Sequence, residues 1–136
     1  MRVIRELDEA RIAELHRLYQ NEWWSRSRSL EETTAGVKGS QACYGILSED
    51  GELIAFTRVL TDFIFKALIF DVIVRKDYRG NGLGNELLSL VKTDPDLAKV
   101  RHFELYCLPE MIPLYEKHGF STDVSGVQLM RFTANQ

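Results

Sequence analysis

The stretch Leu68–Val91, LIFDVIVRKDYRGNGLGNELLSLV, decides the fold because it predicts a strand, a glycine-rich loop and a helix in succession. The apolar, β-branched run Leu68–Val74 predicts a strand that is buried on both faces. Leucines recur at helical spacing from Leu83 onward and predict an amphipathic helix. Between strand and helix, Arg79–Gly84 predicts the loop and the first helical turn.

The glycine-rich loop has the composition of an anion-binding site. Gly80, Gly82 and Gly84 carry no Cβ, so a ligand can approach the backbone closely. The first amides of a helix have no intrahelical partner, and the helix dipole adds partial positive charge there. A phosphate group is therefore the most natural ligand, and Arg79 adds a positive charge beside it.

Three kinds of phosphate-binding loop compete for this stretch. The P-loop of nucleotide hydrolases needs Gly-Lys-Ser/Thr, but Asn85-Glu86 follows Gly84 here. A dinucleotide-binding fold needs Gly-x-Gly-x-x-Gly near the start of the chain, whereas this loop reads Gly-x-Gly-x-Gly and lies past the middle. The third pattern, Arg-x-x-Gly-x-Gly after a hydrophobic strand, is filled by Arg79, Gly82 and Gly84. A glycine-rich turn without a ligand stays as the alternative.

The third pattern resembles the pyrophosphate loop of the GNAT (GCN5-related) superfamily of N-acetyltransferases. Leu114–Phe120 is similar to a second segment of that family, with Tyr115 three residues before Gly119-Phe120. Ala55–Val59 followed by Phe70–Val72 resembles small bacterial members and the arylalkylamine-type (serotonin) acetyltransferases. The two main segments occur in the family's order and spacing, and the resemblance covers essentially the whole chain.

Composition limits the classes of function. The 136 residues, 45% of them hydrophobic, predict one domain over residues 1–136. A net charge of -3 gives no basic surface for nucleic acid and weakly favours cationic substrates. No apolar run approaches the roughly 20 residues that span a bilayer, so we expect no membrane partner. The charged N-terminus is unlike a signal peptide, and two cysteines without metal-ligand spacing predict a cytoplasmic protein without a metal.

The rest of the chain predicts alternating strands and short helices. The expected class is α/β, with a mixed, mostly antiparallel sheet and helices on both faces. This order also resembles the GNAT fold, in which a splayed central pair of parallel strands admits the cofactor. The expected elements are a strand at 3–4, a helix capped by Asp8 to about Glu22, a helix at 30–37 capped by Ser27 or Ser29, strands at 43–48, 53–60, 63–74 and 100–107, a helix from Pro109 to Gly119, and a hairpin of 120–123 with 127–132 around Ser125-Gly126.

The resemblance implies that acetyl-CoA is the cofactor and that no metal is needed. Backbone groups of the central strand would pair with the pantetheine arm like an added strand. Amides of the loop would hold the pyrophosphate. The residues implied are Val72, Ile73 and Val74 on the strand, and Arg79, Gly80, Asn81, Gly82, Leu83 and Gly84 in the loop.

Catalytic roles follow from the resemblance as well. Tyr115 matches the tyrosine that protonates the departing CoA thiolate, with core packing as the alternative. Asp71 interrupts the apolar strand and is the candidate general base; the alternative is an ion pair, for example with Arg58. His102 and Glu104 are lesser candidates on the neighbouring strand. No base pattern accompanies Cys107, and Leu108–Glu110 lacks the family's usual asparagine after that strand, which puts that cofactor contact in doubt.

These observations predict an acetyl-CoA-dependent N-acetyltransferase. The amine would attack the thioester directly in a ternary complex, and a small-molecule amine is favoured over a protein. Trp23, Trp24, Phe63 and Phe65 suggest a closed aromatic pocket for arylalkylamines, although the same residues suit a core or a dimer contact. The alternatives are a non-catalytic acyl-CoA-binding sensor and an acetyltransferase of protein N-termini or lysines. A homodimer is also open, because dimers are common in the family.

Overall fold

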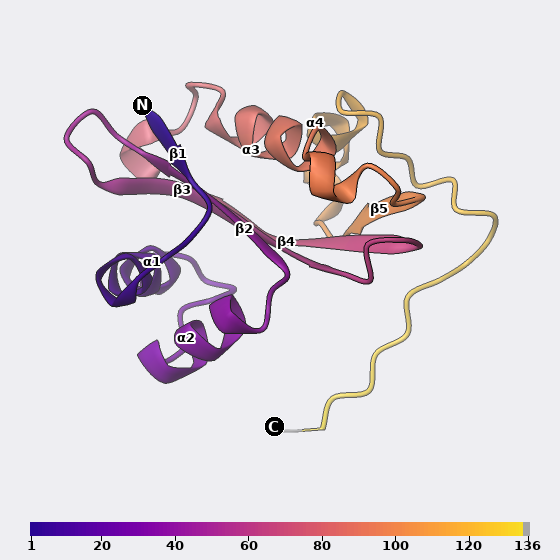
Figure 1. Ribbon diagram of the computed structural model, residues 1–136. Coiled ribbons are helices and arrows are strands. Elements are labelled where there is room, and N and C mark those ends of the chain that lie inside the picture. Colours follow the sequence, from indigo (N-terminus) through magenta and orange to yellow (C-terminus); the bar gives the residue numbers. More distant parts are fainter. Residues whose placement is uncertain (135–136) are drawn as a thin grey trace. The chain divides into compact units, whose positions relative to one another are not determined.

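A five-stranded sheet organises the first of two compact units, Met1–Tyr106 (Figure 1). The computed structural model describes residues 1–134. Neighbouring strands follow chain order, and all pairs are antiparallel except the last, which is parallel. The expected mixed, mostly antiparallel α/β class is therefore confirmed. The strands are β1 (Arg2–Ile4), β2 (Ala42–Leu47), β3 (Leu53–Thr61), β4 (Lys66–Val74) and β5 (His102–Leu105).

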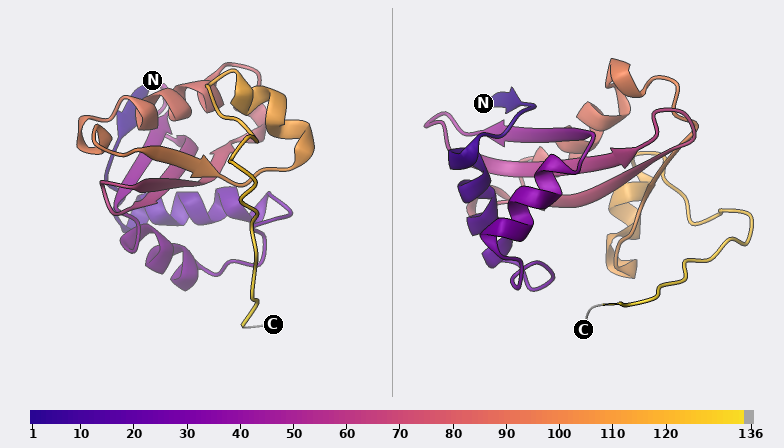
Figure 2. Two further views of the ribbon diagram at one scale, coloured as in Figure 1. Left: turned by 90° about the vertical axis from the view of Figure 1, so that its right-hand side faces the viewer. Right: turned by 60° about the horizontal axis from the view of Figure 1, so that its bottom comes forward.

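Helices cover both faces of this sheet. The first two, α1 (Glu9–Gln20) and α2 (Leu30–Lys38), lie on one face, and α3 (Leu83–Lys92) lies on the other (Figures 1 and 2). Short 3-10 turns at Lys76–Tyr78 and Pro95–Leu97 flank α3. Because α3 joins β4 to the parallel strand β5, it forms the crossover connection that a parallel pair requires.

Local capping explains where the first two helices begin. The Asp8 carboxylate accepts a hydrogen bond from the Arg11 amide at 2.9 Å. Ser29 and Glu32 form a reciprocal capping box at α2, which selects Ser29 over Ser27 as the cap. The predicted starts are confirmed, whereas α1 ends at Gln20 rather than Glu22.

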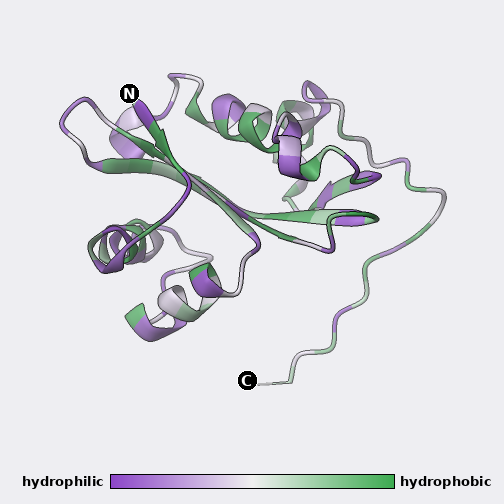
Figure 3. Ribbon diagram, in the orientation of Figure 1, coloured by the Kyte–Doolittle hydropathy of each residue, from purple (hydrophilic) through white to green (hydrophobic). Residues whose placement is uncertain are grey.

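The core of the first unit lies between the sheet and its helices. Figure 3 shows hydrophobic residues along most of the sheet. The apolar face of α3 is buried against it, as the leucine spacing predicted. The expected burial of β4 on both faces is only partly right, because Leu68, Phe70 and Val72 stay half-buried while Ile69 and Ile73 are fully buried.

Strand β4 begins three residues later than expected. The Asp62 carboxylate accepts hydrogen bonds from the amides of Ile64 and Phe65 at 3.0 and 2.8 Å. Phe63 has a φ of 68°, in the left-handed region. This local hydrogen bonding holds residues 62–65 in a turn, so their apolar side chains do not continue the strand. Strand β5 is also shorter than the predicted 100–107.

The second unit begins at Cys107, and its described part, residues 107–134, contains one short α-helix. A 3-10 turn at Pro109–Met111 leads into α4 (Ile112–Glu116). Gly119 has a φ of 88°, and the Phe120 amide donates to the Tyr115 carbonyl at 3.2 Å. The helix ends at Glu116, before the predicted stop at Gly119, which lies in the turn that follows, and the expected single helix is a 3-10 turn followed by a five-residue helix.

The predicted C-terminal hairpin is wrong. The turn forms at Ser125-Gly126, where both residues have positive φ and the Val127 amide donates to the Val124 carbonyl at 3.2 Å. No strand flanks this turn in residues 120–134. The turn signal is local, whereas the strands would have required an apolar face packed on other elements. The large apolar residues after the turn are instead exposed: Val127, Leu129, Met130 and Phe132.

Candidate active site

The pairing between β4 and β5 stops before β4 does. The last paired residues are Ile69 and Leu105, and β4 continues to Val74. Within residues 1–134, no strand pairs with this side of β4 beyond Ile69. Backbone groups of a strand edge can pair with an extended ligand. The predicted pantetheine residues, Val72–Val74, all lie on this part of β4.

A β-bulge lies at the start of this edge. Two residues of β4, Asp71 and Val72, lie opposite the single residue Thr57 of β3. The Thr57 hydroxyl donates to the Phe70 carbonyl at 2.8 Å. Asp71 has a φ of 59°, a left-handed conformation that costs a non-glycine residue on the order of 1 kcal/mol. Bulges re-aim side chains, and this one directs Asp71 toward α1 and the segment before α2.

The Asp71 carboxylate is surrounded by three donors. Tyr19 donates its hydroxyl at 2.8 Å, and Arg58 donates Nε at 2.7 Å, both to Oδ2. Arg28 donates Nη1 to Oδ2 at 2.8 Å and Nη2 to Oδ1 at 3.1 Å. Only 5% of the Asp71 side chain is exposed. We call these four residues the Asp71 cluster.

The electrostatics of the Asp71 cluster follow from these contacts. Burial alone would raise the pKa of Asp71, but the hydrogen bonds from Arg28 and Arg58 outweigh it and lower that pKa. Burial and the neighbouring carboxylate raise the pKa of Tyr19, so its hydroxyl stays protonated. Two guanidinium groups face one carboxylate, which leaves an excess positive charge in the cluster.

The sequence analysis found only part of this cluster. The ion pair of Asp71 with Arg58 was the alternative to a general base, and the structure contains it. The other two partners were missed, because Tyr19 reads as one more apolar position of α1 and Arg28 as one of several charges after it. The feature that could have indicated these partners is Asp71 itself, because a carboxylate within an apolar strand needs hydrogen-bond donors to compensate its burial.

Aromatic rings pack around Arg28. Its guanidinium carbon lies 4.6 Å from the centroid of the Tyr19 ring and 5.5 Å from that of Trp24. Trp24 meets Tyr19 edge to face at 6.2 Å. Trp23 is 70% exposed. Trp24 is therefore placed beside the Asp71 cluster, while most of the Trp23 side chain faces solvent.

The two predicted phenylalanines lie elsewhere. Phe63 and Phe65 belong to the turn before β4, at the opposite end of that strand from Val74. Phe65 packs against the Arg101 guanidinium at 5.2 Å. Among the described residues, no ring contact joins either phenylalanine to a tryptophan. The expected pocket of four aromatic residues therefore stays a prediction, because no contact among the described residues joins these phenylalanines to the tryptophans.

The loop before α3 has the backbone that its glycines predicted. Gly80 and Gly82 have φ values of 83° and 78°, and Gly82 is the N-cap of α3. Gly84 has no positive φ, yet a Cβ there would meet no atom within 4 Å. Neither backbone conformation nor packing explains glycine at this position. Leu83 is buried in the core, so only its backbone is available to a ligand.

Two polar side chains of the loop have partners within the protein. Arg79 donates Nε to the Val74 carbonyl at 3.1 Å and forms an ion pair with Glu22. The Asn81 side-chain amide donates to the Tyr78 carbonyl at 3.0 Å. The Arg79 guanidinium, which we expected beside a phosphate, therefore pairs with Glu22 in the segment that follows α1. The Asn81 side chain stabilises the loop itself.

Tyr115 lies in the second unit. It is half-buried, and its ring meets Phe120 at 6.1 Å. Burial, with a smaller contribution from Cys107, raises the pKa of its hydroxyl, so the group stays protonated at neutral pH. Burial and Glu110 raise the pKa of the exposed Cys107 thiol, which disfavours the thiolate that a nucleophile needs.

The lesser candidates on β5 are both exposed or nearly so. Glu104 pairs with the Lys66 ammonium at 2.8 Å across the parallel strands. His102 is exposed at the start of β5. Both lie within the paired part of the sheet, away from the free edge of β4. Their positions give no support to a role in proton transfer.

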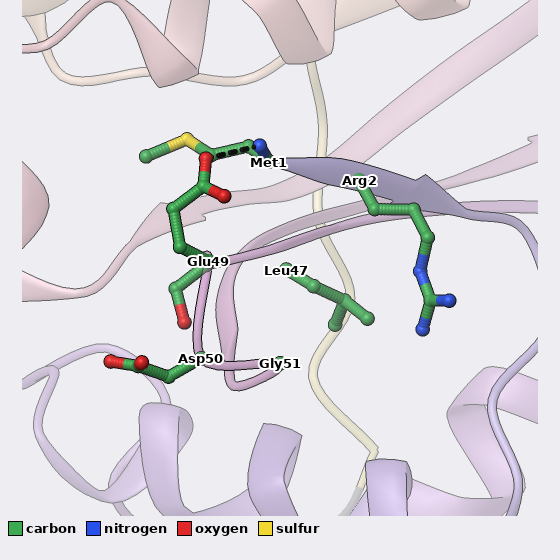
Figure 4. Close-up of a pocket in the computed structure, with 7 residues that line it drawn as sticks. Met1, Arg2, Leu47, Glu49, Asp50 and Gly51 are labelled. Carbon is green, nitrogen blue, oxygen red and sulfur yellow. Dashed lines mark hydrogen bonds and ion pairs between the residues drawn. The ribbon is translucent and has the colours of Figure 1, made fainter.

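A surface hollow lies at the turn between β2 and β3 (Figure 4). The N-terminal amine of Met1 pairs there with Glu49 at 2.7 Å. The Glu49 side chain is largely exposed, so this pair contributes little to stability. None of the predicted site residues lines the hollow; its lining residues are Met1, Arg2, Leu47, Ser48, Glu49, Asp50 and Gly51.

The described residues contain neither a group of metal ligands nor a membrane-spanning helix. Over residues 1–134, no three or more His, Cys, Asp or Glu side chains are grouped to hold a metal ion. Over the same residues, no helix has the length and apolar character to cross a membrane.

Comparison with known proteins places this geometry in a family. Residues 9–120 match the profile described as the acetyltransferase (GNAT) family. The uncharacterized N-acetyltransferase ycf52-like of Prochlorococcus marinus is 30% identical over 135 residues, covering 97% of this chain and 73% of that protein. Serotonin N-acetyltransferase 2, chloroplastic, of rice is 31% identical over 85 residues, covering 62% of this chain but only 42% of that protein.

A solved structure agrees with these sequence matches. It is a protein from Xanthomonas campestris assigned to the GNAT acetyltransferase family, 28% identical, with a TM-score of 0.82. The match covers 98% of this chain and 94% of that one. The resemblance inferred from the glycine loop and the Tyr115 segment is confirmed, as is the predicted enzyme class. The chain belongs to the GNAT family of acetyltransferases.

Proposed function

We propose that this protein transfers an acetyl group from acetyl-CoA to the primary amine of a small molecule, by direct attack in a ternary complex. GNAT acetyltransferases generally use acetyl-CoA. The observation that carries the proposal for this chain is the loop before α3, where Gly80 and Gly82 have positive φ at the helix N-terminus and Gly84 leaves the first helical turn without a Cβ. A ligand that approaches the backbone there accounts for it.

The cofactor would run from the loop along β4. Amides of residues 80–84 would hold the pyrophosphate at the N-terminus of α3. The pantetheine arm would pair with Val72, Ile73 and Val74 on the edge that β5 does not cover. Since β4 runs from Lys66 toward the loop, the acetyl end would lie near Asp71. The residues present therefore fit acetyl-CoA.

The chemical step forms a C–N bond and breaks the C–S bond. The amine nitrogen attacks the thioester carbonyl, the tetrahedral intermediate expels the CoA thiolate, and the nitrogen gives up its proton to a base or to water. An alkylammonium with a pKa of roughly 10 requires about 4 kcal/mol to become neutral at pH 7. Tyr115 would protonate the thiolate, because its raised pKa keeps the hydroxyl protonated.

The role predicted for Asp71 as general base stays a proposal. Its low pKa makes the carboxylate a weak base, and three donors already occupy its oxygens. The same contacts support a second role, in which Asp71 positions Arg28 and Arg58 beside the acetyl end. If the pH profile of kcat/KM is unchanged in Asp71→Asn, the positioning role is supported. If the acidic limb of that profile is lost, the role as general base is supported.

Two observations favour a small amine over a protein acceptor. Trp24 lies next to the Asp71 cluster and can contact an aromatic or aliphatic amine. The rice relative is named for serotonin, a small molecule, which bears on the size of the acceptor and not on its charge. That relative is also named as chloroplastic, so the cytoplasmic location stays a proposal for this chain. The single domain over 1–136 and a homodimer are proposals as well.

The direct test measures CoA released from acetyl-CoA by chromatography, which avoids thiol reagents that Cys43 and Cys107 would also consume. The panel contains arylalkylamines, polyamines, aminoglycosides, amino acids and peptides. Release by small amines well above the rate without amine supports the proposal. Release by peptides alone would indicate a protein acceptor, and acetyl-CoA binding without any stimulated release would indicate a non-catalytic binding module.

A further inference from the structure

The Asp71 cluster presents positive charge to solvent. The Arg28 side chain is 31% exposed and that of Arg58 is 17% exposed, whereas Asp71 is 5% exposed beneath them. The excess charge is therefore carried by the accessible members of the cluster. It acts in a partly buried setting, where electrostatic interactions are less screened than in bulk water.

Both guanidinium groups are held ready to bind a second anion. Each has five N–H donors: Asp71 takes two from Arg28 and one from Arg58, and Arg58 also donates Nη1 to the Ser40 hydroxyl at 3.4 Å. The rings of Tyr19 and Trp24 pack on Arg28, and the ring of Phe70 packs on Arg58 at 5.1 Å. Fixed guanidinium groups recognise carboxylates and phosphates through paired hydrogen bonds.

The cluster is located where an acceptor must approach under the proposed function. Asp71 directly precedes Val72–Val74, the part of β4 that would hold the pantetheine arm. The cluster joins Asp71 of β4 to residues of α1, of the segment before α2 and of β3. Both α1 and α2 lie on the face of the sheet opposite α3 (Figure 2). The acceptor would thus meet the cluster while the loop before α3 holds the other end of the cofactor.

This charge distribution discriminates between kinds of amine. An amine whose only charge is an ammonium is repelled by the excess positive charge. An amine that also carries an acidic group is attracted, and the same field favours the neutral, nucleophilic form of its nitrogen. The net charge of the whole chain, -3, pointed instead to cationic acceptors. Local charge decides here, because more distant surface charges are screened.

From these observations we propose that the acceptor is a primary amine bearing an acidic group, a carboxylate or a phosphate, and that Arg28 and Arg58 bind that group. The proposal rests on the proposed acetyl transfer and names the substrate class of the same site.

Matched pairs of amines test this specificity. Phenylalanine and phenethylamine differ in a carboxylate, and O-phosphoethanolamine and ethanolamine differ in a phosphate. For each pair, kcat/KM is measured with saturating acetyl-CoA, and the amine with the acidic group is compared with the partner whose only charge is its ammonium. We expect a ratio above 1 for at least one pair, and the pair that gives it identifies the acidic group.

Substitutions then assign the preference to the two arginines. Arg28→Gln and Arg58→Gln should each lower that ratio about tenfold or more, since each removes charge-assisted hydrogen bonds to the acidic group. Arg28→Lys keeps the charge and should lower it less. Arg26→Gln, at an exposed position two residues away, should leave it unchanged. Loss of folded protein cannot produce the effect, because both rates of a pair come from the same sample.

Binding supplies a second readout. Trp23 and Trp24 are the only tryptophans of the chain, and Trp24 lies beside Arg28, so quenching of their fluorescence should report the acidic amine and weaken in Arg28→Gln. Equal kcat/KM for both members of each pair, unchanged by Arg28→Gln and Arg58→Gln, would overturn the inference while leaving acetyl transfer intact. No acetylation of any amine would overturn the proposed function as well.

Discussion

Substitution of Gly84 by alanine should make the protein more stable and a poorer binder of acetyl-CoA. Gly84 lies in the first turn of α3, its φ is not positive, and an added Cβ would meet no atom within 4 Å. Alanine therefore fits the fold without strain. Glycine within a helix costs roughly 0.5–1 kcal/mol relative to alanine, so we expect a gain in unfolding free energy up to that size.

The loss in binding follows from the same position. The Cβ would occupy the space in which we place the pyrophosphate and would displace it from the helix amides. Loss of one hydrogen bond to a charged group costs about 1.5–3 kcal/mol, which corresponds to an increase in Kd of about 10- to 100-fold. Stability and affinity should thus change in opposite directions.

The assay combines urea unfolding with calorimetric titration of acetyl-CoA. Gly36→Ala is the matched control, because Gly36 lies within α2 and a Cβ there also meets no atom within 4 Å. It should raise stability by a similar amount and leave Kd unchanged. Gly82→Ala should lower stability, since its φ of 78° strains any residue with a Cβ. Wild-type affinity in Gly84→Ala would refute the assignment of the loop as the pyrophosphate site.

Three further predictions address catalysis, burial and acid stability. Tyr115→Phe should lower kcat about 100-fold in steady-state assays while the Kd for acetyl-CoA stays unchanged, because the hydroxyl acts only on the departing thiolate; equal kcat would exclude it as the acid. Asp71→Asn should lower the unfolding free energy by about 3 kcal/mol in urea titrations, because two guanidinium groups lose their counter-charge; a change below about 0.5 kcal/mol would contradict this. Asp94 accepts hydrogen bonds from Tyr44 at 2.5 Å and from Arg5 at 2.9 Å. Burial raises the pKa of Asp94, but these contacts outweigh burial and lower that pKa. Its contribution to stability should be present above the unfolded pKa of about 3.9 and be lost as the pH falls through the lower folded pKa. Asp94→Asn should therefore flatten the decline in stability as the pH falls below about 4, measured by unfolding at each pH, and an unchanged decline would contradict the role of Asp94.

Features encoded by neighbouring residues could be predicted from the sequence. Asp8 and Ser29 cap helices through amides three residues away, and the glycines before α3 set their own backbone conformation. The same is true of the turn at Ser125-Gly126. In each case the interaction that fixes the structure lies within one turn of chain, so the local pattern contains the required information.

Features that depend on distant residues could not be predicted in this way. Asp71 is held by donors from α1, from the segment before α2 and from β3, and the bulge that directs it there appears only when β3 and β4 are paired. The ion pair between Arg79 and Glu22 likewise joins segments far apart in the chain. The prediction of a C-terminal hairpin was wrong for the same reason, because strand formation requires a packed face as well as a turn.

Acetyl transfer from acetyl-CoA to a small amine can be tested by following both products in one chromatographic assay. We expect equimolar CoA and N-acetylated amine with at least one small amine, at a rate well above that without amine, and a large loss of that rate in Tyr115→Phe. Binding of acetyl-CoA without amine-dependent formation of either product would contradict it.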